Sequence, residues 1–155
     1  MHSRGQLHGE IKCDNIFYTE DGAIKLYNFG YISQLQQKKA GRGAPYWMAP
    51  EQLKKQKFDA KVDIWALGIL IFEMIEKEPP YVDDPPLRAL FRLVTENPPS
   101  IKNPDNWGTN LHDFLDKCLR KDPATRETAE QLKLHPFLQE SCSVADWNEN
   151  IIKKI

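Results

Sequence analysis

The chain has 155 residues, of which 41% are hydrophobic, so it is long enough for one compact domain and too short for two ordinary ones. Its 21 Lys and Arg residues nearly balance its 22 Asp and Glu residues, which gives a formal charge of -1. A charge this small produces no field that would attract nucleic acid or an anionic membrane, and we expect neither as a partner.

The cysteines and the apolar runs indicate the compartment. Cys13, Cys118 and Cys142 have no C-x-x-C spacing, so neither a disulfide framework nor a zinc site is predicted. The longest apolar run, residues 64–72, is far below the roughly 20 residues that a membrane-spanning helix requires. The N-terminus carries no apolar signal region. We therefore expect a cytoplasmic protein, with the nucleus as the alternative.

The first third of the chain predicts a short β-hairpin. Residues 16–18 and 23–26 flank a polar segment, residues 19–22, which ends in Asp-Gly. Asp-Gly between two apolar-rich segments is a strong signal for a hairpin. Residues 33–43 are then rich in Gln, Lys, Arg and Gly, which is the composition of an exposed loop.

The elements that follow are predicted to be helices. Within residues 59–77 apolar side chains cover most of a helix circumference, so this helix should be buried nearly all round, at the centre of the fold. Pro79 and Pro80 end it, because proline has no amide donor and restricts the residue before it. Three amphipathic helices are predicted at residues 87–94, 111–119 and 128–134.

Four motifs in order carry a resemblance to a known family. Residues 8–15 read H-G-E-I-K-C-D-N and resemble the catalytic loop of protein kinases, H-R-D-x-K-x-x-N. Residues 28–30 read N-F-G where that family has D-F-G, and residues 43–51 read G-A-P-Y-W-M-A-P-E, one residue away from the end of the PAK-type activation segment. Residues 63–68 read D-I-W-A-L-G, similar to the D-x-W-x-x-G pattern of the family's central helix. Over residues 1–138 the chain resembles the C-terminal lobe of a PAK-type (sterile-twenty group) serine/threonine protein kinase.

This resemblance implies a mainly α fold, a kinase-like C-terminal lobe built as a helical bundle with a short β-hairpin near the N-terminus. Residues 1–138 would form the lobe and residues 139–155 a C-terminal tail. A Gly-rich loop and a strand lysine, which hold the nucleotide from above in a complete kinase, do not precede the catalytic loop. We therefore expect the N-terminal lobe to be absent.

The resemblance also assigns catalytic and binding roles, and two of these positions are altered. Glu10 is at the catalytic-base position, where one extra methylene moves the carboxylate outward by about 1 Å. Asn28 replaces the aspartate that holds magnesium beside the nucleotide, and a neutral amide is a weaker ligand for a hard cation. Lys12 resembles the lysine that meets the transferred phosphate, Asn15 resembles the second metal ligand, and Phe17 is implied to contact the nucleotide. The alternative for the retained polar residues is that they only hold the loop.

Five further positions resemble the structural framework of the family. His8 and Phe29 are implied to pack the catalytic loop against the central helix, and Asp63 to accept hydrogen bonds from the amides of that loop. Glu51 and Arg126 are implied to form a buried ion pair that holds the activation segment. We expect this framework to be kept although the chemistry is altered.

Three aromatic residues are candidate anchors for a protein partner. Trp47, Tyr81 and Phe91 fall at or near the groove that receives protein substrates in the family, between the activation segment and the helix at residues 87–94. The alternative is that these side chains only pack the lobe.

These observations leave three hypotheses. The first is a catalytically impaired PAK-like fragment that acts as a scaffold, decoy or regulator in intracellular signalling, with a kinase or a kinase substrate as its partner and no cofactor. The second is a partial serine/threonine protein kinase that transfers the γ-phosphate of ATP, with magnesium, to protein Ser or Thr. The third is a remnant without a stable fold, which a cooperative unfolding transition would exclude.

Overall fold

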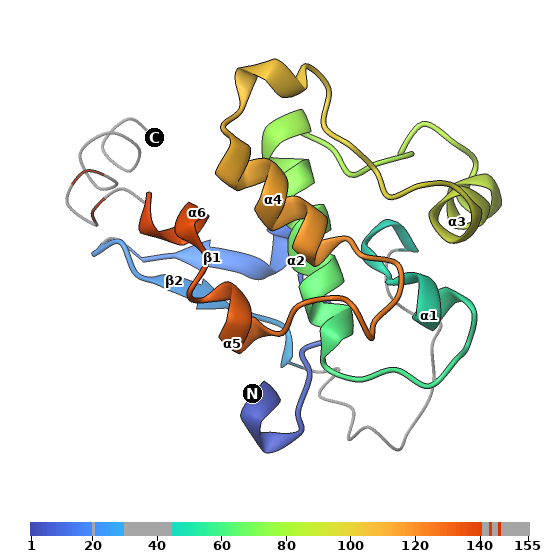
Figure 1. The fold of residues 1–155 in the computed structure, drawn as a ribbon. Helices are drawn as coiled ribbons and strands as arrows, with labels where there is room; N and C mark the ends of the chain where they lie inside the picture. Colours follow the sequence, from blue (N-terminus) through green and yellow to red (C-terminus); the bar gives the residue numbers. More distant parts are fainter. Residues whose placement is uncertain (20, 30–44, 141–142, 144–145, 147–155) are drawn as a thin grey trace.

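The structure, a computed structural model, describes the chain except residues 20, 30–44, 141–142, 144–145 and 147–155. The described residues form a bundle of helices and a two-stranded sheet near the N-terminus (Figure 1). The predicted mainly α fold with a short hairpin is confirmed. The predicted loop at residues 33–43 and most of the predicted tail lie outside the described residues, and the division at residue 138 stays a prediction.

The hairpin consists of β1 (Ile16–Tyr18) and β2 (Ile24–Leu26), which are antiparallel, with Phe17 opposite Lys25. Its turn closes where the Thr19 amide donates to the Ala23 carbonyl over 2.9 Å. Gly22 allows the chain to turn here, because its φ of 82° is a left-handed conformation that costs glycine little free energy. The predicted hairpin is thus confirmed, with the second strand beginning one residue later than predicted.

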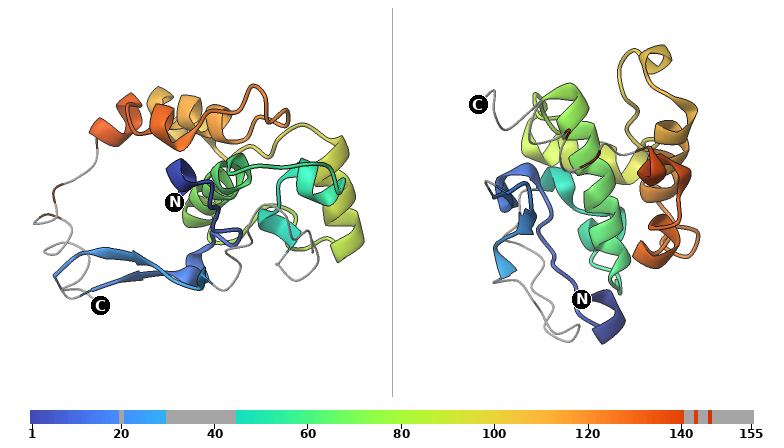
Figure 2. Two further views of the ribbon diagram at one scale, coloured as in Figure 1. Left: turned by 90° about the horizontal axis from the view of Figure 1, so that it is seen from below. Right: turned by 90° about the vertical axis from the view of Figure 1, so that its left-hand side faces the viewer.

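Helix α2 (Lys61–Glu76) is the central element, and it lies between the hairpin on one side and the α4–α6 region on the other (Figure 2). Its first three turns are almost wholly buried, as the apolar pattern predicts. Met74 contradicts the expected burial of this helix nearly all round, because its side chain is 60% exposed. Within residues 71–76 only Phe72 is buried among the apolar residues, while Ile71 and Ile75 are partly covered, so α2 is buried on one face near its end.

The other helices are short and are joined by irregular segments. The predicted helices at residues 87–94 and 111–119 are confirmed within two residues at each end. The one predicted at residues 128–134 is shorter, because Thr128 caps it, accepting from the Gln131 amide over 3.3 Å. Besides α2, the α-helices of the described residues are α1 (Pro50–Leu53), α3 (Pro86–Thr95), α4 (Thr109–Cys118), α5 (Ala129–Leu132) and α6 (Pro136–Gln139). Short 3₁₀ turns cover His2–Arg4, Cys13–Asn15, Pro45–Trp47 and Pro104–Asn106.

Helices α1 and α6 were not predicted from the sequence. Each has four residues, which is too short to show a periodic apolar pattern, and each begins at a proline. His135 caps α6, because its Nδ1 atom accepts from the Phe137 amide over 3.2 Å. Among the described residues, none of the helices combines the length and apolar character that crossing a bilayer demands.

Helices α2 and α4 approach each other closely at a glycine. A Cβ atom on Gly68 would lie 2.7 Å from the Cδ2 atom of Leu119 and 2.9 Å from the Cβ atom of Cys118. Real Cβ atoms do not approach other heavy atoms this closely, so the two helices pack here only because residue 68 has no side chain. Glycine at this position therefore fixes the distance between the central helix and its neighbour.

We expect Gly68→Ala to lower the free energy of unfolding by about 1–3 kcal/mol, because overpacking outweighs the better helix propensity of alanine. Urea denaturation followed by circular dichroism measures the change. Gly108→Ala is the matched control, since a Cβ atom there meets nothing within 4 Å. We expect the control to change stability by less than about 1 kcal/mol. Equal effects of the two substitutions would contradict the close helix contact.

Candidate functional site

The segment that resembles a catalytic loop is anchored to the first turn of α2 by Asp63. The carboxylate of Asp63 accepts from the backbone amide of His8 over 2.7 Å and from that of Gly9 over 2.8 Å. Its Oδ2 atom also lies 2.8 Å from the Nε2 atom of His2. Asp63 is only 2% exposed, so its negative charge is compensated by these donors and by the N-terminal end of the helix. This carboxylate holds the backbone of the loop in place.

His8 connects the loop to the segment that follows β2. Its buried ring lies 2.8 Å, through Nε2, from the carbonyl oxygen of Tyr27, and its Nδ1 atom accepts from the Glu10 amide over 3.2 Å. This pattern requires the proton on Nε2, because a carbonyl oxygen only accepts. The ring of Phe29 packs edge to face on His8 at 5.2 Å between centroids, while its remaining surface is exposed.

The two altered positions, Glu10 and Asn28, contact each other. The Nδ2 atom of Asn28 donates to the Oε2 atom of Glu10 over 2.7 Å. A carboxylate only accepts hydrogen bonds, so the amide nitrogen and not the amide oxygen must face Glu10. Asn28 has a φ of 67°, a left-handed conformation in which asparagine is several-fold enriched among non-glycine residues. Asn28, at the position that resembles the magnesium ligand, therefore donates a hydrogen bond to Glu10, at the position that resembles the catalytic base.

Lys12 and Asn15 complete the loop. The Nζ atom of Lys12 lies 3.8 Å from Oε1 of Glu10 and 3.1 Å from Oδ2 of Asp14, so one positive charge lies between two carboxylates. The Nδ2 atom of the buried Asn15 donates to the backbone carbonyl of Glu10 over 2.8 Å. This hydrogen bond uses the amide nitrogen of Asn15, so the Oδ1 atom, through which an amide binds a metal ion, takes no part in it. Both side chains thus contact other groups of the loop, and their role toward a phosphate or a metal ion stays a prediction.

Phe17, the residue implied to contact a nucleotide, lies on β1 with its side chain 51% exposed. Its ring packs edge to face on Tyr27 at 5.6 Å between centroids. Phe17 thus presents an exposed apolar side chain on β1, in the hairpin that precedes Asn28 in the chain. Its role toward a nucleotide stays a prediction.

Glu73, on α2, is a site residue that the sequence analysis missed. Its Oε2 atom accepts from the indole nitrogen of Trp47 over 3.0 Å and from the backbone amide of Cys13 over 3.3 Å. It therefore ties the catalytic-loop segment and the segment at residues 45–47 to the central helix. The sequence signal that could have indicated Glu73 is an acidic residue inside a strongly apolar helix. A carboxylate in such a place needs hydrogen-bond partners, because burying it without them costs free energy.

Burial, together with the neighbouring Glu73, raises the pKa of the Cys13 thiol to about 12. We therefore expect native Cys13 to react with iodoacetamide at pH 8 at least about a hundredfold more slowly than in the urea-unfolded chain, because the thiolate is the reactive form. Mass spectrometry of the alkylated peptide measures the rate. Glu73→Gln should accelerate the reaction, since it removes the charge that opposes ionisation. Equal rates in the native and unfolded chains would contradict this environment.

Glu51 and Arg126 form a bidentate ion pair in the core. The Nη1 atom of Arg126 lies 2.6 Å from Oε1 of Glu51, and Nη2 lies 3.0 Å from Oε2. Two further guanidinium protons are used as well, since Nε donates to the carbonyl of Arg120 and Nη1 to that of Lys61. The guanidinium also lies 5.3 Å from the ring of Trp65. The pair joins α1 to the segment before α5, as the resemblance implied.

The three candidate partner anchors are in different environments. Trp47 is half-buried against the core and bound to Glu73, which gives it a packing role. Tyr81 is half-buried under the guanidinium of Arg92, 4.0 Å from its ring centroid. Phe91, on α3, is 66% exposed. Of the three, Phe91 keeps the apolar surface that a partner requires.

Comparison with known proteins identifies the class to which this fold and this loop belong. Residues 1–138 match the family model of the protein kinase domain, so the chain belongs to the protein kinase family. It is 48% identical over 147 residues to the serine/threonine-protein kinase pakB of Dictyostelium discoideum. The matched region covers 92% of this chain and 17% of that protein.

Other relatives narrow the group within the family. The chain is 46% identical over 144 residues to the serine/threonine-protein kinase STE20 of Candida glabrata, covering 90% of the chain and 16% of that protein. It is 42% identical over 145 residues to the serine/threonine-protein kinase PAK mbt of Drosophila melanogaster, covering 91% of the chain and 23% of that protein. Its relatives are thus PAK and STE20 serine/threonine kinases, and the chain spans less than a quarter of the length of these three.

Proposed function

We propose that the chain is a catalytically impaired PAK-like kinase module that acts in signalling as a scaffold, decoy or regulator, by binding a kinase or a kinase substrate. The observation that carries the proposal is the 2.7 Å hydrogen bond from Asn28 Nδ2 to Glu10 Oε2. It engages the amide nitrogen of Asn28 with a carboxylate oxygen of Glu10, so the two altered positions bind each other.

Metal binding is the first function that this contact opposes. Magnesium prefers anionic oxygen ligands in octahedral geometry, and two asparagines supply no carboxylate between them. The Asn28 amide also turns its donor group toward Glu10. The donor set therefore does not fit a magnesium ion well.

Base catalysis is the second function that the contact between Asn28 and Glu10 opposes. A base that takes a proton from a substrate hydroxyl must have a free carboxylate oxygen within hydrogen-bond reach of it. In this chain Oε2 of Glu10 accepts from Asn28, and Oε1 lies near the ammonium group of Lys12. Both carboxylate oxygens of Glu10 therefore already have a polar neighbour in the position where a substrate hydroxyl would have to approach.

The second candidate function is that of a partial serine/threonine kinase, which would transfer the γ-phosphate of ATP to a protein hydroxyl. Two observations favour it: Lys12 and Asn15 are retained, and the relatives named above are serine/threonine kinases. In that case Lys12 would offset charge on the phosphate, and Glu10 would orient the hydroxyl. This activity requires Glu10 to leave its contact with Asn28.

The test is thermal unfolding with and without ATP and magnesium. We expect no rise in the midpoint for the chain, because a ligand raises stability only if it binds the native state. Asn28→Asp should lower the midpoint by placing two carboxylates side by side, and magnesium should then restore part of it. Asn106→Asp, an exposed position outside the site, is the control for the added charge. A midpoint that rises with ATP and magnesium, together with labelling of a protein substrate by γ-labelled ATP, would instead support the second candidate.

A further inference from the structure

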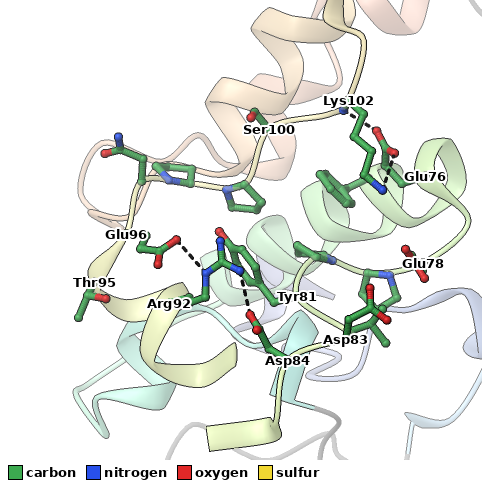
Figure 3. Close-up of a pocket in the computed structure, with 17 residues that line it drawn as sticks. Glu76, Glu78, Tyr81, Asp83, Asp84, Arg92, Thr95, Glu96, Ser100 and Lys102 are labelled. Carbon is green, nitrogen blue, oxygen red and sulfur yellow. Dashed lines mark hydrogen bonds and ion pairs between the residues drawn. The ribbon is translucent and has the colours of Figure 1, made fainter. Parts of the chain in front are cut away.

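A pocket of about 850 Å³ lies between the end of α2, the segment that joins α2 to α3, the end of α3 and residues 96–102 after it (Figure 3). Its lining contains no residue of the catalytic-loop segment 8–15 and no part of the contact between Glu10 and Asn28. The volume is within the range of about 300–1,000 Å³ that is typical of ligand pockets in proteins. The pocket is thus a separate feature from the site described above.

Its apolar walls are built from aromatic and proline rings. These are Phe72, Pro79, Pro80, Tyr81, Pro98 and Pro99. Proline rings have almost no side-chain entropy to lose, so such walls bind a ligand at a low conformational cost.

The centre of the pocket is held rigid by Arg92. Its guanidinium lies 4.0 Å from the Tyr81 ring, and it bonds Oδ2 of Asp84 over 2.8 Å and Oε2 of Glu96 over 2.9 Å. The hydrogen bonds to these two carboxylates raise the pKa of Arg92. Tyr81 is therefore fixed before any ligand arrives, and Arg92 has no free charge to offer one.

The lining as a whole is acidic. It contains five carboxylates and two cationic side chains. Arg92 is used by Asp84 and Glu96, while Lys102 contacts Glu76 through both its amide, at 2.6 Å, and its ammonium group, at 3.7 Å.

Two carboxylates of the lining remain available to a ligand. Within the described part of the chain, Glu78 and Asp83 have no recorded hydrogen bond or ion pair. In Figure 3 both lie on one side of Tyr81, opposite Glu96. A cation that enters the pocket would therefore meet two uncompensated negative charges on one wall.

We propose that this pocket binds an extended, proline-containing, cationic segment of a partner protein. Extended polyproline-type segments have no internal hydrogen bonds and little entropy to lose, and grooves lined by aromatic side chains recognise them. An arginine or lysine beside the prolines would pair with Glu78 and Asp83, while the prolines pack on Tyr81 and the proline walls. The inference deepens the proposed function by naming a class of partner, and it depends on that function for its biological meaning.

The test uses the complete chain without nucleotide and a fluorescently labelled peptide with the core Arg-Pro-Pro-Arg, and measures anisotropy. We expect saturable binding that weakens severalfold as salt is raised, because salt screens the charge pairs. A peptide with Ala-Ala in place of Pro-Pro should bind more weakly, and one with Glu in place of Arg should not bind. Absence of saturable binding, or equal binding of the Glu peptide, would overturn the proposal.

A pair of double variants separates the pocket from general charge. Glu78→Gln with Asp83→Asn should weaken binding about fivefold or more, because it removes the two free carboxylates. Asp105→Asn with Glu130→Gln changes the net charge equally at exposed positions outside the pocket and should leave the affinity unchanged. Equal losses in the two variants would overturn the proposal, and thermal midpoints check that both remain folded.

Failure of this inference and failure of the proposed function give different results. The peptide assay contains no ATP, so a negative result there leaves the absence of nucleotide binding intact. Binding of ATP with magnesium would contradict the proposed function without affecting the peptide measurement.

Discussion

Arg126→Met is expected to lower the free energy of unfolding by about 3–5 kcal/mol, because it leaves the carboxylate of Glu51 buried without its cation. Glu51 is only 2% exposed, so water cannot replace the two lost hydrogen bonds. The carbonyl oxygens of Arg120 and Lys61 lose donors in the same variant. Urea denaturation measures the loss, and if the variant is already unfolded in buffer, its far-ultraviolet circular dichroism shows it.

A second variant separates the stranded charge from the loss of packing. Arg126→Met combined with Glu51→Leu removes both charges, and replacing a whole buried pair by apolar residues is often neutral. We expect the double variant to be more stable than Arg126→Met alone. Lys133→Met breaks an exposed ion pair with Glu130 and serves as the control, with an expected change below about 1 kcal/mol. If Arg126→Met lowered the free energy of unfolding as little as the control does, the buried pair would not stabilise the lobe.

Asp63→Ala is the second substitution with a large expected effect, a loss of about 2–4 kcal/mol. The reason is that it removes the acceptor for the amides of His8 and Gly9, and an unsatisfied buried donor costs about 1–3 kcal/mol. Hydrogen exchange gives the specific readout, since these two amides should lose protection before the amides of α4 do.

The control for this prediction is Asp59→Ala, which removes another aspartate that accepts from a backbone amide, that of Lys61 over 2.8 Å, at the exposed start of α2. We expect it to cost about 1 kcal/mol, the usual net effect of losing one hydrogen bond. If Asp63→Ala cost no more than this, or if the loop amides stayed protected, Asp63 would not be the anchor of the loop.

Local patterns were sufficient for the main elements. The hairpin was predicted because the Asp-Gly turn and its flanking segments are adjacent in the chain. Helix α2 was predicted because a run of apolar residues this long reports burial directly. Met74 was placed wrongly, because an apolar residue near the end of a buried helix can lie on either face.

Contacts between distant residues were beyond the reach of sequence patterns alone. Glu73 contacts Trp47 and Cys13, which are 26 and 60 residues away, and no local pattern pairs them. Asp63, Glu51 and Arg126 were assigned only because the motifs resemble those of a family, and their geometry agrees with that assignment.

By itself, the sequence determined the class of fold, the family and the altered residues Glu10 and Asn28, because these depend on residue type and on spacing along the chain. Only the tertiary structure decided that Asn28 donates to Glu10, which is 18 residues away in the chain. It also decided that Tyr81 lies beneath Arg92 in an acidic pocket. The physical reason is that hydrogen bonds and ion pairs act over a few ångströms in space, and folding alone brings residues so far apart in the chain within that distance.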